Sequence, residues 1–235
     1  MKTTILTEKL KQIPAFHLYP IVAFNPLTEM ILKMDFTIAN NSLTSKIIED
    51  VELFSNYITQ QLQSKGAAYG IGGYDEHRTV YSRSKVFDSA NNELPRRLHL
   101  GIDIWGSAGT EVFAPLDGEV LSFAFNQQYG DYGATIILKH QIDELHFYSL
   151  YGHLSLADIQ SINKGDQIKG GDLLAHFGEP NENGQWPPHL HFQLMYDLEG
   201  NVGDYPGVCS LENRNHYLAN CPDPDCILGL MQYAK

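Results

Sequence analysis

The stretch that decides the fold is residues 186–195, Trp-Pro-Pro-His-Leu-His-Phe-Gln-Leu-Met. Side chains two positions apart on a β-strand point to the same face, so His189 and His191 are presented side by side at the edge of a buried sheet. Two adjacent imidazoles indicate metal chemistry. An isolated pair is a weak signal, because many core strands carry a histidine that is simply hydrogen-bonded. The interpretation therefore depends on partners elsewhere in the chain.

A histidine and an aspartate lie upstream, in residues 96–106. His99 and Asp103 share one face of a strand, but four extended residues span roughly 13 Å, too far for both to lie about 2 Å from one zinc ion. The chain must therefore bend, and Gly101 permits the bend. A helix also brings positions i and i+4 together, but the glycine and two isoleucines disfavour a helix here. Taken singly, His99 fits a surface histidine and Asp103 a turn residue equally well.

A third element, residues 148–155, alternates like a strand and contains His153. The motifs His99-x-x-x-Asp103, Tyr151-Gly152-His153-Leu154 and His189-x-His191 thus follow one another along the chain. Together they resemble the lysostaphin/LytM-like zinc metallopeptidases, which cleave peptide cross-links of bacterial cell walls. The resemblance covers about residues 97 to 196. It includes a framework of glycines: Gly106, Gly118, Gly133, Gly165 and Gly170.

The resemblance implies a role for each motif residue. His99, Asp103 and His191 are expected to hold one zinc ion per chain, and His153 and His189 to stand beside it as catalytic histidines. Three protein ligands leave a fourth position open for water, as in catalytic zinc sites, and a nearby histidine can take a proton from that water. The ligand set suits zinc, although manganese, cobalt or iron also fit it. Spacing does not tell which histidine is the base.

Alternating segments separated by Gly, Pro or Asn turns predict strands at residues 112–114, 118–125, 134–140, 145–151, 166–168 and 189–196. Short turns favour a mostly antiparallel sheet that is folded or packed on itself. With the resemblance, this predicts a mainly β protein with an N-terminal α/β extension, whose antiparallel β-sandwich or barrel-like core holds the metal in an open groove. Aromatic side chains are the expected groove walls: Tyr129, Tyr132, Tyr151 and Trp186.

Three regions are expected along the chain. Residues 1–95 form a helix-containing support or lid, residues 96–200 the metallopeptidase catalytic domain, and residues 201–235 a C-terminal extension. Apolar residues at helical spacing predict an amphipathic helix over residues 42–65, which stops at a Lys-Gly pair. The glycine-rich loop at residues 69–78 can reach the metal cleft from above. It either blocks the metal or, more simply, packs against the rim of the fold.

Composition limits the partners and the location. The net charge is −12, with 28 acidic and 16 basic residues, which argues against nucleic acid as a partner. Apolar runs stay below the roughly 18 residues of a membrane span. The first ten residues do not resemble a secretory signal, so a cytoplasmic protein is expected, or an exported one if a leader is missing. For Cys209, Cys221 and Cys226 we expect free thiols or a late disulfide rather than a structural zinc site.

Two functions fit this pattern. The first is a zinc metalloendopeptidase that hydrolyses a short peptide bond, containing Gly or a D-amino acid, in a peptide or peptidoglycan fragment. The second is a non-hydrolytic, metal-binding module of the same fold that binds a peptide or a small metabolite. The complete set of five motif residues favours the enzyme, because a binding module needs no extra histidines beside an already liganded metal.

Overall fold

The structure is a computed structural model that describes residues 2–12, 18–88 and 94–235. At its centre is an eight-stranded sheet with the order β1-β2-β4-β11-β8-β7-β6-β9. Neighbouring strands are antiparallel, except that β1 and β2 are parallel. These strands are β1 (Ile31–Lys33), β2 (Tyr69–Gly72), β4 (Ile102–Trp105), β6 (Gly118–Asn126), β7 (Gly133–Ile142), β8 (Leu145–Leu154), β9 (Gln167–Ile168) and β11 (His189–Met195). The predicted mainly β, antiparallel fold is confirmed.

Two short ribbons flank this sheet. One pairs β5 (Glu111–Phe113) with β10 (Leu173–His176), and the other pairs β3 (Leu98–His99) with β12 (Val208–Cys209). Strand β10 was not among the predicted strands. Its sequence, Leu-Leu-Ala-His, is short and does not alternate between apolar and polar residues, so it gives little periodic signal.

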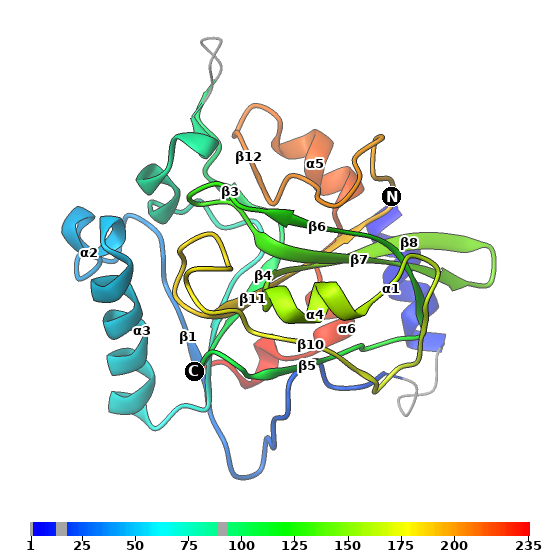
Figure 1. Ribbon diagram of the computed structural model, residues 1–235, viewed down its shortest axis with the longest axis horizontal. Helices are drawn as coiled ribbons and strands as arrows, with labels where there is room; N and C mark the ends of the chain where they lie inside the picture. Colours follow the sequence, from blue (N-terminus) through cyan, green and yellow to red (C-terminus); the bar gives the residue numbers. More distant parts are fainter. Residues whose placement is uncertain (1, 13–17, 89–93) are drawn as a thin grey trace.

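Helices surround the sheet, and α4 lies in front of its middle strands (Figure 1). They are α1 (Lys2–Gln12), α2 (Ser45–Glu49), α3 (Val51–Lys65), α4 (Leu156–Ser161), α5 (Arg214–Asn220) and α6 (Asp225–Leu228), with 3-10 turns at Val80–Arg83, Lys85–Phe87 and Met231–Tyr233. Figure 1 places α2 and α3 on one side of the molecule, beside β1. Among the described residues, every helix is too short or too polar to cross a lipid bilayer.

The predicted N-terminal helix is present as two helices. Asp50 lies between them in an extended conformation, and its side chain accepts hydrogen bonds from the backbone of Glu52 and Leu53 at the start of α3. This is the usual way an aspartate caps a helix. At the other end Gly66 has φ 62°, the left-handed conformation that closes helices at glycine. The predicted stop is therefore confirmed.

Strand β11 divides its side chains between two faces, because successive residues of a strand point in opposite directions. Its even-numbered residues join the largest hydrophobic cluster of the protein: Leu190, Phe192 and Leu194. Its odd-numbered residues, which include both histidines, face the other side. The same rule sends Ile102 and Ile104 of β4 into the cluster and leaves Asp103 on the histidine face.

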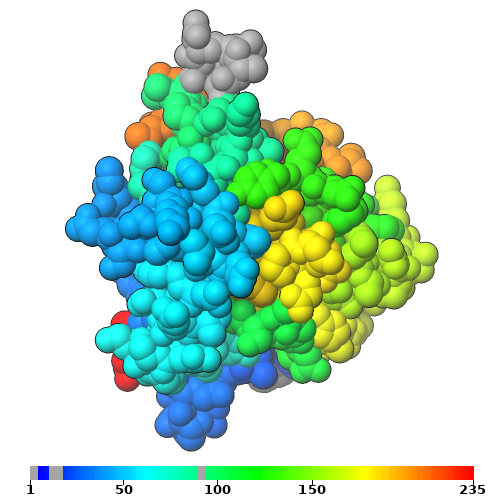
Figure 2. Space-filling view, turned by 60° about the vertical axis from the view of Figure 1, so that its left-hand side comes forward, coloured from blue at the N-terminus to red at the C-terminus, as the bar shows by residue number. Residues whose placement is uncertain are grey.

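The N-terminal region contributes to this same sheet. Strand β2 pairs with β4, and Gly72 lies opposite Asp103. Phe54 of α3 contacts Trp105 and Trp186, with ring centroids 6.0 and 6.5 Å apart. Figure 2 shows the surface of α2 and α3, in blue to cyan, meeting the yellow segment that precedes β11. Residues that lie early in the sequence thus border the strands that carry the histidines.

Candidate metal centre

The register of β4 against β11 brings two of the predicted ligands together. Asp103 is the direct neighbour of His191 across the two strands, and both side chains lie on the same face. Each residue is only 3% exposed. The strand alternation that exposes a histidine pair in the sequence therefore also places a carboxylate beside it.

His99 reaches this pair because the chain bends where the sequence predicts. Strand β3 ends at His99 and β4 begins at Ile102. A Cβ atom on Gly101 would lie 2.7 Å from Cε1 of His191 and 2.7 Å from the carbonyl oxygen of Phe192. No side chain fits in that space, so the bend requires glycine and allows His99 to approach His191.

Three ligand atoms converge at this point. Nε2 of His99 lies 3.2 Å from Oδ1 of Asp103 and 2.9 Å from Nδ1 of His191. Nδ1 of His191 lies 3.0 Å from the same Oδ1 atom. A tetrahedral zinc ion with bonds of about 2.0–2.2 Å separates its ligand atoms by roughly 3.3 Å. The triangle therefore has nearly the dimensions that a metal requires.

The other ring nitrogens fix the protonation of the two histidines. Nδ1 of His99 donates to the carbonyl oxygen of Gly73 at 3.0 Å, and Nε2 of His191 donates to Oε1 of Gln193 at 3.0 Å. A neutral imidazole has one N–H, so the two nitrogens that face each other both carry lone pairs. With Oδ1 of Asp103, three acceptors meet with no proton between them. This His-Asp-His group can bind a metal ion, and the outward N–H contacts are those of metal-ligating histidines.

The surroundings of the triangle also favour neutral imidazoles and an ionised carboxylate. Burial lowers the pKa of His99 to about 4, and the neighbouring Arg78 guanidinium adds to this effect. Burial alone would raise the pKa of Asp103, but its polar neighbours His99 and Arg78 outweigh burial and hold this pKa well below its usual value. At neutral pH the site thus offers a neutral imidazole and a carboxylate, the forms that bind metals.

Two further histidines lie beside the triangle. Nδ1 of His153 donates to the carbonyl oxygen of Asn183, and Nδ1 of His189 donates to that of Pro187, both at 2.8 Å. Each ring therefore has a lone pair on Nε2. The ring centroids are 4.1 Å apart. Burial lowers the pKa of His189 to about 4, and burial together with His189 lowers that of His153 well below its usual value. Both rings are neutral bases.

A β-bulge aims His153 at this site. Ala134 of β7 pairs with Leu154 and Ile136 with Tyr151, so β8 has one extra residue in this interval. His153 has φ 63°, a left-handed conformation that is rare outside glycine. A bulge with such a residue reverses the direction of the following side chain. His153 therefore faces the metal site although it lies two positions after Tyr151.

The same bulge corrects the prediction for Tyr151. This ring is fully buried and packs against Phe192 with centroids 5.2 Å apart, on the main core side of the sheet. In the sequence analysis Tyr151 is an expected groove wall, a candidate to stack on a bound peptide. It does not line the groove.

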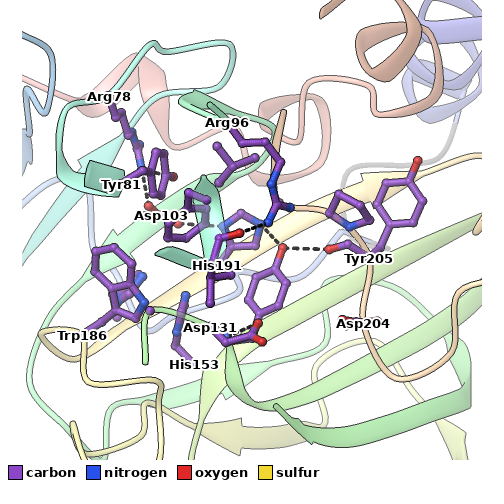
Figure 3. A pocket seen from close by; sticks show the side chains of 18 of the residues that line it. Arg78, Tyr81, Arg96, Asp103, Asp131, His153, Trp186, His191, Asp204 and Tyr205 are labelled. Atoms are coloured by element: carbon purple, nitrogen blue, oxygen red, sulfur yellow. Dashed lines mark hydrogen bonds and ion pairs between the residues drawn. The ribbon is translucent and has the colours of Figure 1, made fainter. Parts of the chain in front are cut away.

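A pocket of about 180 Å³ opens beside the site. Figure 3 shows its labelled side chains pointing inward around His191 and Asp103. Of the predicted residues, it is lined by Asp103, Tyr132, His153, Trp186, His189 and His191. Tyr129 is not among its lining residues, and its hydroxyl accepts instead from Nε of Arg83 at 3.0 Å. Of the aromatic residues expected in the groove, Tyr132 and Trp186 thus line this pocket and Tyr129 lies outside it.

Two residues at the site, Gln193 and Trp105, were not singled out from the sequence. Gln193 contacts His191, and its place two residues further along the same strand face was a usable signal. Trp105 stacks on His189, with centroids 3.9 Å apart and planes 12° apart, because the two are register partners. Arg78 forms a buried ion pair with Asp103. Arg78 belongs to the glycine-rich loop that was expected to reach the metal cleft, and only its pairing with Asp103 was not predicted.

Comparison with known proteins agrees with this geometry. Residues 97–202 match the model of peptidase family M23. We refer to this matching segment as the M23 domain. It contains all three predicted metal ligands and both predicted catalytic histidines. The resemblance seen in the sequence is thereby confirmed.

Several curated proteins are similar to this M23 domain. An uncharacterized metalloprotease of Haemophilus influenzae is 34% identical over 140 residues, which are 59% of this chain and 27% of that protein. The murein hydrolase activator NlpD of Escherichia coli is 36% identical over 96 residues, which are 41% of this chain and 22% of that protein. The DD-carboxypeptidase/endopeptidase Mpg of Neisseria meningitidis is 30% identical over 125 residues, which are 52% of this chain and 26% of that protein. The chain spans about a quarter of the length of these relatives.

Among solved structures, the catalytic domain of the antimicrobial peptidase lysostaphin from Staphylococcus simulans is similar to this chain. The sequence identity is 20%, the match covers 74% of this chain and 97% of that one, and the TM-score is 0.41. The similar curated proteins include some that are named as peptidases and some that are named as activators.

Proposed function

We propose that this protein is a zinc-dependent metallopeptidase that hydrolyses a short peptide bond containing glycine or a D-amino acid, as in cell-wall cross-links. The observation that carries the proposal is the convergence of Nε2 of His99, Oδ1 of Asp103 and Nδ1 of His191, three acceptors without a proton. The match to peptidase family M23 and the similarity to a DD-carboxypeptidase/endopeptidase support hydrolysis of a peptide. One zinc ion per chain fits this single triangle.

The pocket residues can carry the proton transfers of such a reaction. His99, Asp103 and His191 would hold a zinc ion, which would supply Lewis-acid polarisation of the peptide carbonyl and lower the pKa of a water molecule. Nε2 of His153 or His189 accepts a proton from the attacking water and delivers one to the leaving amine. The protonated ring also stabilises negative charge on the carbonyl oxygen. Trp186 and Tyr132 form the walls that hold the peptide.

Different parts of the structure orient the side chains of His153 and His189. His189 is stacked on Trp105 and sits on a regular strand, whereas His153 is placed by the bulge. Both therefore have a fixed orientation, as a proton-transfer group requires, and each must be tested separately.

A second candidate is a non-hydrolytic module that binds a peptide through the same pocket. The 36% identity to a protein named murein hydrolase activator favours it. A binding role does not use two histidines with free Nε2 atoms beside the metal ligands. This M23 domain retains both, so hydrolysis is the preferred proposal.

The test is zinc content and hydrolysis of muropeptides and of short Gly- or D-Ala-containing peptides by the purified protein. We expect about one zinc per chain, as for a single His-Asp-His site. His191→Ala should lose the metal, whereas His153→Ala and His189→Ala should keep it, and all three should lose at least about 100-fold in rate. His146→Ala is the matched control, because His146 lies exposed on the same strand as His153.

Each result has a defined meaning. Zinc without hydrolysis of any of these substrates favours the binding module. A wild-type protein that binds no zinc removes the proposed metal site. Full activity in both His153→Ala and His189→Ala contradicts the proposed proton transfer, while the cytoplasmic location expected from the sequence stays a prediction in every case.

A further inference from the structure

Arg78 is the most completely buried charged side chain beside the metal triangle. It is 1% exposed and lies in the glycine-rich loop that precedes the M23 domain. Its Nη1 atom forms an ion pair with Oδ2 of Asp103, and its Nε atom donates to Oε2 of Glu76 at 2.6 Å. Nη2 donates to the carbonyl oxygen of Gly73 at 3.3 Å. Every edge of the guanidinium is thus engaged.

The two oxygens of Asp103 consequently have different partners. Oδ1 faces Nε2 of His99 and Nδ1 of His191 at 3.2 and 3.0 Å. Oδ2 faces the opposite way and is bound by Arg78. A carboxylate oxygen held by a charge-assisted hydrogen bond is fixed in place and is withdrawn from the metal.

We infer that Arg78 is a positioning residue of the metal centre, which holds Asp103 as a ligand through one oxygen only. The inference rests on the proposed metal site. A carboxylate that ligates through one oxygen keeps the number of protein ligand atoms at three, and this leaves room for water and substrate. Without Arg78, Asp103 would be free to rotate and to use both oxygens.

The glycines of the loop provide the space for this arrangement. A Cβ atom on Gly72 would lie 2.5 Å from Nη2 of Arg78, so the guanidinium fits only beside glycine. Gly72 is also the register partner of Asp103, which places the loop directly over the ligand. The carbonyl oxygen of Gly73 binds both Arg78 and Nδ1 of His99. One short segment therefore orients two of the three ligands.

Charge balance explains why the arginine is tolerated next to a cation site. Glu76 and Asp103 flank the guanidinium, so the positive charge has a carboxylate on either side. A buried charge is stable only when it is paired and hydrogen-bonded. The loop approaches Asp103 from the side of Oδ2 and does not cover Oδ1. This geometry supports the ligand rather than blocking the metal.

The test measures zinc affinity by competition with a chelator, together with the visible spectrum of the Co²⁺-substituted protein. In Arg78→Met we expect zinc affinity to fall roughly 10- to 100-fold, as for other residues that orient a metal ligand. The Co²⁺ absorption should weaken, because a second oxygen from Asp103 raises the coordination number. Arg83→Met is the matched control. Arg83 is also a buried arginine of this region, but it stacks on Trp186 and should leave zinc affinity unchanged.

The outcomes separate this inference from the proposed function. A folded Arg78→Met protein with wild-type zinc affinity and an unchanged Co²⁺ spectrum overturns the inference and leaves the metallopeptidase proposal standing. A wild-type protein without zinc removes both. If Arg78→Met does not fold, Arg78→Lys is the variant that tests the inference. Lysine keeps the positive charge but cannot donate the several hydrogen bonds of the planar guanidinium. A wild-type spectrum and affinity in that variant also overturn the inference.

Discussion

At the scale of single residues, Gln193 selects the nitrogen that His191 offers to a metal. Its Oε1 atom accepts from Nε2 of His191 at 3.0 Å, and its amide nitrogen donates to the carbonyl oxygen of Pro206 at 3.1 Å. The second contact fixes which end of the amide faces the histidine. Gln193 is fully buried, so no water can replace it without a rearrangement.

We therefore expect Gln193→Leu to weaken zinc binding roughly 10- to 100-fold, because His191 loses the acceptor that fixes its tautomer. Chelator competition measures the change, and Gln141→Leu serves as an exposed control on β7. Unchanged affinity in a folded Gln193→Leu protein would show that the tautomer is set in another way.

A second single-residue prediction concerns His140, which lies away from the metal. Its Nδ1 atom donates to the carbonyl oxygen of Asp117 at 2.7 Å, and Nε2 accepts from Ser149 at 2.6 Å. Burial lowers its pKa from 6.5 to about 4. Between pH 6.5 and about 4, the unfolded chain therefore binds a proton at His140 that the folded chain does not bind. The stabilising contribution is complete above pH 6.5 and is lost as the pH falls towards 4.

The free energy of unfolding of the metal-free protein should thus fall with acidification between pH 6.5 and 4, the range set by this pKa. The share of His140 is at most roughly 1.4 kcal/mol per pH unit. In His140→Gln the free energy of unfolding should depend less steeply on pH, because unfolding would take up as much as about one proton fewer. Urea unfolding at several pH values measures this slope. Parallel curves for the two proteins would contradict the assignment.

At the scale of elements, the bulge in β8 needs a glycine before His153. Gly152 lies opposite His191, and a Cβ atom there would come within 2.5 Å of Cδ1 of Tyr132. We expect Gly152→Ala to displace that ring, to cost about 1–3 kcal/mol of stability, and to reduce hydrolysis. Thermal unfolding and peptide hydrolysis measure both effects. Gly73→Ala is the control for thermal unfolding alone, because a Cβ atom on Gly73 meets no atom within 4 Å. Equal thermal stability of the two variants would argue against the steric explanation.

Periodicity predicted most elements of the M23 domain, but it did not reveal the bulge. Alternation correctly placed His189 and His191 on one face, because β11 is regular. Alternation alone would put Tyr151 on the face of His153, but one inserted residue reverses the face of everything beyond it. Such an insertion leaves no mark on the hydrophobic pattern of a single strand. It depends on the register with β7, which is a property of two segments.

At the scale of the whole molecule, the metal triangle depends on segments that the M23 match leaves out. The match begins at residue 97, whereas β2, Arg78 and α3 lie before it. The sequence predicted the ligands from motif spacing, but it did not show that residues 69–78 pair with β4. That contact joins distant parts of the chain, and the short β2 strand, Tyr-Gly-Ile-Gly, has too little periodicity to predict a partner.

A shortened chain of residues 94–235 should therefore fail to form the site. Its β4 strand would lose the ladder with β2, and Trp105, which is only 2% exposed, would lose its cover from Phe36 and Phe54. The carboxylate of Asp103 would be left buried without Arg78, which costs about 3–5 kcal/mol when one partner of a buried pair is removed. We expect this fragment to show no cooperative thermal unfolding and no zinc binding, whereas the full chain should show both. A fragment that folds and binds zinc as tightly as the full protein would show that the M23 domain builds its metal centre alone.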